Sequence, residues 1–141
     1  MARRVSALVI KDDYVLLVKL KEQDKLMPRA TWVFPFVDID QDTSPRMAIS
    51  DLLSKFKIDY SMGEKVFKYS PSENPKLNYF LYVIEYESGD PDVTSAFQTY
   101  KWVKITDITA YSTSFMDGNV SKYLNERSER TEKQPLIKPL N

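Results

Sequence analysis

The chain has 141 residues, and its 20 basic and 20 acidic side chains give a formal net charge of zero. This length is that of one domain, and the neutral balance excludes a strongly basic nucleic-acid or membrane binder. The chain has no cysteine and no histidine. That excludes a thiol nucleophile, a serine–histidine relay, disulfides and Cys- or His-ligated metals, so any metal would be a hard cation held by carboxylates.

The first half of the chain alternates strand patterns with turns. Residues 5–10 and 14–20 are apolar and predict two strands joined by a tight turn at Asp12, because aspartate tolerates the left-handed backbone region. Residues 21–30 are charged and predict a loop. Residues 31–39 favour a strand that Pro35 must interrupt, because proline has no N–H for the ladder.

A helix is expected at 44–57, where Ser44 would cap it and Pro45 would take its first position. After it we expect strands at 65–69, 78–86 and 97–105, then short helices at 106–111 and 117–125. The order predicts an α+β domain over residues 1–125 with a mixed β-sheet. Residues 126–141 are charged, contain two prolines and predict a flexible tail.

No apolar run approaches the about 18 residues that span a membrane. The run at 5–10 is too short for the core of a signal peptide. The three glycines lie far apart, which excludes a P-loop and a dinucleotide fingerprint. We therefore expect a cytoplasmic protein that spans no membrane.

Eight residues between positions 32 and 58 have the spacing of a known family motif. It comprises Trp32, Phe34, Pro35, Ser44, Pro45, Ala48, Leu52 and Ile58. With a one-residue deletion near 49–50, this stretch resembles the box of the Nudix (MutT-like) hydrolase superfamily. The resemblance covers about residues 4–125 and implies a Nudix-like α/β/α sandwich with a mixed β-sheet.

In active members of that family, three glutamates at i, i+3 and i+4 share one helix face and hold divalent cations. The matching positions here are Asp51, Ser54 and Lys55, so Asp51 is the one remnant of the catalytic set. The family's arginine, earlier glutamate and glycine pair become Ser50, Thr43, Phe36 and Val37. The resemblance thus implies a degenerate box. Members of the family often have a further glutamate, later in the chain, that acts as a general base. Its place here is taken by Gln98, which cannot abstract a proton.

Two of these substitutions have physical consequences. Lys55 lies one turn after Asp51, where an ammonium can pair with the carboxylate and would repel a dication. Val37 at positive φ would be strained, so the segment must take another path or stay extended. Phe36 would then fill part of the substrate space.

We expect no resident metal or cofactor, or Mg²⁺ or Mn²⁺ if the domain is active. The weak metal candidates are Asp51, Asp38 and Asp40. Asp38, Asp40 and Asp42 would share one face of an extended segment, and a solvated polar edge is the favoured interpretation over a calcium loop.

The candidate ligand-binding residues are Lys19, Arg29, Phe36, Tyr79 and Gln98. The two cations would meet phosphates or merely belong to a soluble surface, and the two rings would stack on a base or belong to the core.

Three functions remain open. The leading one is a Nudix-fold domain that binds a nucleotide, an RNA end or a partner with little or no hydrolase activity. The alternative is an active metal-dependent hydrolase of nucleoside diphosphate derivatives that uses Asp51 with acids of the 38–42 segment. The third is a purely structural interaction domain, and a homodimer is compatible with each.

Overall fold

The computed structural model describes residues 2–111 and 116–133, with side chains described as far as residue 130. The strands are β1 (Arg3–Lys11), β2 (Tyr14–Lys19), β3 (Trp32–Val33), β4 (Phe36–Ile39), β5 (Asp59–Tyr69), β6 (Asn78–Ser88) and β7 (Thr99–Lys104). The helices are α1 (Pro45–Phe56), the 3₁₀ helix η1 (Ile105–Ala110) and α2 (Gly118–Lys133).

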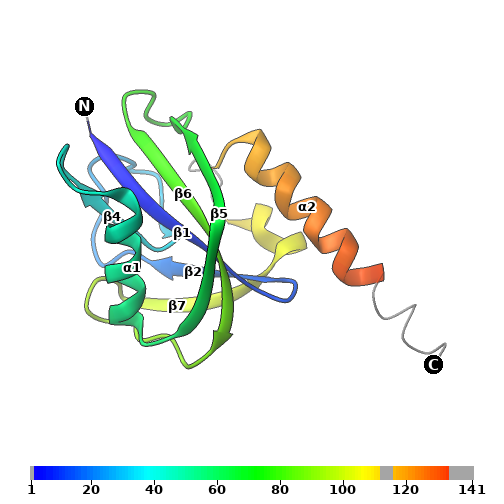
Figure 1. Cartoon of the computed structure of the whole chain (residues 1–141). Helices are drawn as coiled ribbons and strands as arrows, with labels where there is room; N and C mark the ends of the chain where they lie inside the picture. The colour runs from blue at the N-terminus through cyan, green and yellow to red at the C-terminus, as the bar shows by residue number, and fades with distance from the viewer. Residues whose placement is uncertain (1, 112–115, 134–141) are drawn as a thin grey trace.

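The described strands form one seven-stranded sheet in the order β3-β2-β1-β6-β5, with β4 beside β1 and β7 beside β2. β1 runs parallel to β6, and the other pairs are antiparallel, so the sheet is mixed. Helices α1 and α2 lie on opposite sides of this sheet (Figure 1). The expected α+β sandwich with a mixed sheet is confirmed.

The sheet forks along β1. Residues 3–6 of β1 pair with β4, whereas its last residues, Ile10 and Lys11, pair with β2. Between the two branches the Ala7 N–H donates to the Pro35 carbonyl at 2.9 Å. Pro35 separates β3 from β4 as the sequence predicts, because it cannot donate a ladder hydrogen bond. The fork leaves room for a cleft between β4 and the β2–β7 branch.

Helix α1 forms where its capping and periodicity predict. The Ser44 hydroxyl accepts from the Met47 N–H, Pro45 takes the first turn, and Lys57 ends the helix with φ of 60°. One apolar stripe faces the sheet: Ala48, Ile49, Leu52, Leu53 and Phe56. Phe56 is fully buried and meets the Phe97 ring edge-on at 6.3 Å.

Two backbone expectations hold. The turn between β1 and β2 places Asp12 at a φ of 54°. Phe36 and Val37 lie in the extended strand β4, so the segment avoids positive φ by staying extended.

Two element boundaries differ from the sequence expectation by more than two residues. β5 begins at Asp59 rather than at 65, because a register shift between Met62 and Val66 keeps Gly63 inside the strand. α2 continues to Lys133 rather than ending at 125. Its second half is held by an ion pair from Arg127 to Glu85 and by burial of Ser128. The rest of the expected tail, 134–141, lies outside the described residues. No helix within the described ranges is long and apolar enough to cross a membrane.

The α1 stripe gives a stability prediction. We expect Phe56→Ala to lower the free energy of unfolding by about 3–5 kcal/mol, because a buried ring leaves a cavity. Met47→Ala, at an exposed position of the same helix, should change it by less than about 0.5 kcal/mol. Urea unfolding of both variants beside the wild type measures the difference. Equal midpoints for the two variants would contradict the packing of α1 described here.

Candidate functional site

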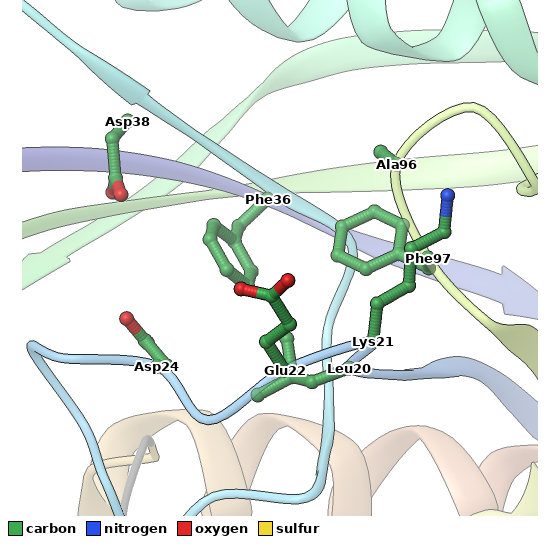
Figure 2. A pocket seen from close by; sticks show the side chains of 8 residues that line it. All are labelled: Leu20, Lys21, Glu22, Asp24, Phe36, Asp38, Ala96 and Phe97. Carbon is green, nitrogen blue, oxygen red and sulfur yellow. The ribbon is translucent and has the colours of Figure 1, made fainter.

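Two neighbouring pockets share the side chain of Asp38. The larger, about 430 Å³, opens at the fork of the sheet and is called the fork pocket. Its lining is Leu20, Lys21, Glu22, Asp24, Phe36, Asp38, Ala96 and Phe97 (Figure 2). The smaller, about 290 Å³, lies between α1 and β4 and is called the helix pocket. Its lining is Val37, Asp38, Ile39, Asp40, Thr43, Ala48, Asp51, Leu52 and Lys55.

A buried arginine organises the wall between the pockets. Arg4, on β1, is only 1% exposed and stands opposite Asp38 in the β1–β4 register. Its Nε donates to Asp38 Oδ1 at 2.7 Å and its Nη2 to Asp38 Oδ2 at 3.1 Å. Its Nη1 and Nη2 donate to the two carboxylate oxygens of Asp24, at 2.5 and 3.0 Å. The guanidinium also lies over the Phe36 ring, 3.9 Å from the centroid.

The electrostatics of this cluster favour the charged guanidinium. Burial alone would lower the pKa of Arg4, but the hydrogen bonds and charges of Asp24 and Asp38 outweigh it. The pKa of Arg4 is therefore held above its ordinary value. The cluster joins β1, β4 and the loop at 20–31, because each of these segments supplies one of its members.

The carboxylates of the helix pocket already have partners, with one exception. Both oxygens of Asp38 accept from Arg4. Asp40 Oδ1 accepts from the Thr43 hydroxyl at 2.7 Å and from the backbone N–H groups of Thr43 and Asp42. The hydrogen bond from the Thr43 hydroxyl is the largest cause that holds the pKa of Asp40 below its usual value. The exception is Asp51, which has no hydrogen bond or ion pair among the described residues. The Lys55 ammonium lies in the same lining.

Within the described ranges, no ion pair joins Asp51 to Lys55, so the expected i,i+4 pair is absent. In the same ranges, no group of three or more carboxylates lies close enough together to hold a metal ion.

The structure separates the box positions named from the sequence. Val37, Thr43, Asp51 and Lys55 line the helix pocket, whereas Phe36 lines the fork pocket. Ser50 lines a separate pocket that also contains Asp51. Ser54 is exposed on α1.

Of the candidate ligand-binding residues, Phe36 lies in a pocket wall described above and the other four do not. The expectation that Tyr79 is exposed near the cleft is wrong: it is 2% exposed, packs against Tyr69, and burial raises the pKa of its phenol. Lys19 is half-buried in β2. Arg29 and Gln98 are exposed, and the Gln98 backbone N–H donates to the Lys19 carbonyl.

Sequence reasoning missed Arg4, Glu22, Asp24 and Phe97. Arg4 has a detectable signal, since an arginine in an apolar strand requires buried carboxylates beside it. The carboxylates themselves follow 20 and 34 residues later, and no local pattern connects them to β1.

Comparisons with known proteins identify the fold of the chain. A scan against protein-family models and a search of curated proteins gave no match. Many solved structures do match. A MutT structure from work on Aliivibrio salmonicida and Vibrio cholerae has a TM-score of 0.57 and 14% identity, with 92% of this chain and 98% of that chain covered. The chain has a Nudix-like fold.

Two further structures support this assignment. The Caenorhabditis elegans Ap4A hydrolase has a TM-score of 0.63 at 13% identity, covering 92% of this chain and 96% of its own. An ADP-ribose pyrophosphatase from Streptococcus suis has a TM-score of 0.63 at 14% identity, covering 90% and 91%. At these identities the likeness concerns the fold alone, and it confirms the Nudix-like fold expected from the box spacing.

The buried cluster of this Nudix-like domain gives a second stability prediction. Arg4→Met should lower the free energy of unfolding by about 3–5 kcal/mol, because it leaves the largely buried carboxylate of Asp24 without its cation. Arg46→Met is the matched control, since Arg46 is exposed and its hydrogen bonds to backbone carbonyls are 3.3 and 3.4 Å long. Thermal and urea unfolding measure both. A loss no larger for Arg4→Met than for Arg46→Met would show that the cluster contributes nothing to stability.

Proposed function

We propose that this chain is a Nudix-fold binding domain with a degenerate box and little or no metal-dependent hydrolase activity. The observation that carries the proposal is the state of the helix-pocket carboxylates. Asp38 accepts hydrogen bonds from the buried Arg4, and Asp40 accepts one from the Thr43 hydroxyl. The remaining carboxylate, that of Asp51, shares the pocket with the Lys55 ammonium.

These residues do not fit a divalent cation. Each oxygen of Asp38 already accepts a hydrogen bond from Arg4, so a metal ion bound there would compete with a buried guanidinium for the same carboxylate charge. The Lys55 ammonium adds repulsion in the same pocket. A hard dication gains affinity from the number and charge of its oxygen ligands, and one free aspartate supplies little of either.

The ligand that we propose is a nucleotide or a nucleoside diphosphate derivative. Two neighbours in fold are named as an Ap4A hydrolase and an ADP-ribose pyrophosphatase, which supports this ligand class. The fork pocket, at about 430 Å³, lies in the range of volumes typical of small-molecule sites. We also propose a cytoplasmic location. The oligomeric state is a separate question, and light scattering in solution decides between a monomer and a homodimer.

One observation favours the alternative of an active hydrolase. Asp38, Asp40 and Asp51 line a single pocket, as an enzyme built on Asp51 and the 38–42 segment would require. In that enzyme the metal ion would share the carboxylate of Asp38 with the guanidinium of Arg4.

Metal titration separates the two functions. We expect calorimetry with Mg²⁺ and Mn²⁺ to find no site tighter than millimolar, and ADP-ribose and Ap4A to remain uncleaved with either metal. A micromolar site that Asp51→Ala abolishes, or turnover that depends on Asp51, would establish the hydrolase instead.

A restored box is the positive control for that titration. The triple variant Asp51→Glu, Ser54→Glu, Lys55→Glu places three carboxylates at i, i+3 and i+4 and removes the ammonium. Mn²⁺ affinity should then appear. A folded triple variant that binds no Mn²⁺ would show that these positions do not share a metal-facing surface, and that the box alignment is wrong.

A further inference from the structure

One carboxylate of the fork pocket has no hydrogen-bond or ion-pair partner among the described residues. Asp24 and Asp38 use their oxygens on Arg4, and the Lys21 ammonium donates to the Thr94 carbonyl at 2.8 Å. Glu22 is exposed and, within the part of the chain that the structure describes, has no hydrogen bond or ion pair. In Figure 2 its side chain rises from the loop toward the rings of Phe36 and Phe97.

The charge of the pocket disfavours a phosphate. The lining contains one lysine and three carboxylates, and Arg4 stands behind it, so one negative charge is in excess. The free group is itself an anion, which would repel a phosphate and accept hydrogen bonds from N–H donors. A ligand in this pocket therefore presents donors, and any phosphates it carries point out of the pocket.

The Phe36 ring favours a neutral aromatic ligand over a cation. The Arg4 guanidinium lies over the Phe36 ring, and Arg4 is buried and does not line the pocket. It therefore covers the face of the ring that points into the protein. A cation on one face draws electron density from the ring and weakens its attraction for a second cation on the other. Phe97 meets the Phe36 ring edge-on at 5.6 Å, and the two rings together give the pocket an aromatic surface that suits a neutral base.

We propose that the fork pocket binds a purine base whose Watson–Crick edge presents adjacent N–H donors to Glu22, as guanine does with N1–H and the 2-amino group. This rests on the proposed function, in which the ligand is a nucleotide, and it makes Glu22 the residue that selects the base. Two parallel donors match the two oxygens of a carboxylate. Adenine fits less well, because its N1 acceptor would face the carboxylate.

Nucleosides without phosphate test this assignment on the full chain. We expect guanosine to bind more tightly than inosine, which lacks the 2-amino group, and adenosine to bind most weakly. Glu22→Gln should weaken guanosine binding by about tenfold, because hydrogen bonds to an ionised acceptor are the stronger class. Glu64→Gln, the same change at an exposed site on β5, should leave every affinity unchanged. Chemical-shift titration measures the affinities, and thermal melting checks that both variants are folded.

Several results would overturn the assignment. Equal affinity for the three nucleosides, no binding of any of them, or unchanged guanosine binding by Glu22→Gln would each do so. N-acetylarginine amide, a guanidinium probe, should bind more weakly than guanosine, and the reverse order would assign the pocket to a basic segment of a protein partner. Hydrolysis with Mg²⁺ would contradict the proposed function alone, because base selection through Glu22 involves no metal.

Discussion

The buried guanidinium of Arg4 is the constraint on which the cleft depends. A charge at this depth is tolerated only when carboxylates neutralise it and accept its hydrogen bonds. Asp24 must come from the loop and Asp38 from β4, so both segments are drawn to the first half of β1. The cluster therefore ties the loop and β4 to β1 beside the fork of the sheet, where Asp38 lines both pockets.

The same interaction limits the chemistry of the cleft. Asp38 lines the helix pocket, yet each of its oxygens already accepts a hydrogen bond from Arg4, and Lys55 brings a positive charge to the same lining. On the other side, Arg4 covers one face of Phe36, and Glu22 has no polar partner among the described residues. These two features are the basis for our proposal that the cleft of the Nudix-like scaffold suits hydrogen-bond donors better than a metal-bridged diphosphate.

The sequence predicted what depends on local chemistry. Ser44 and Pro45 start a helix, Pro35 interrupts a strand, and Asp12 takes a left-handed turn, and each of these is decided within a few residues. The Nudix-like fold was implied in a different way, by the resemblance of residues 32–58 to the box of that family.

What the sequence could not predict depends on tertiary contacts. The length of α2 depends on Glu85 in a distant strand, and the burial of Tyr79 depends on its position in β6 beside Tyr69. The cluster around Arg4 joins residues 20 and 34 positions apart. Only the fold brings them together, so sequence reasoning missed Arg4. It did single out four residues that line the two pockets: Phe36, Thr43, Asp51 and Lys55.

The most direct measurement of this constraint is a double-mutant cycle between Arg4→Met and Asp24→Asn, read out as the free energy of unfolding in urea. If the buried cluster fixes the cleft, the two changes are coupled, with an interaction energy of about 1–3 kcal/mol. If the losses add within about 0.5 kcal/mol, Arg4 and Asp24 act independently, and the buried ion pair is not what holds the loop against β1.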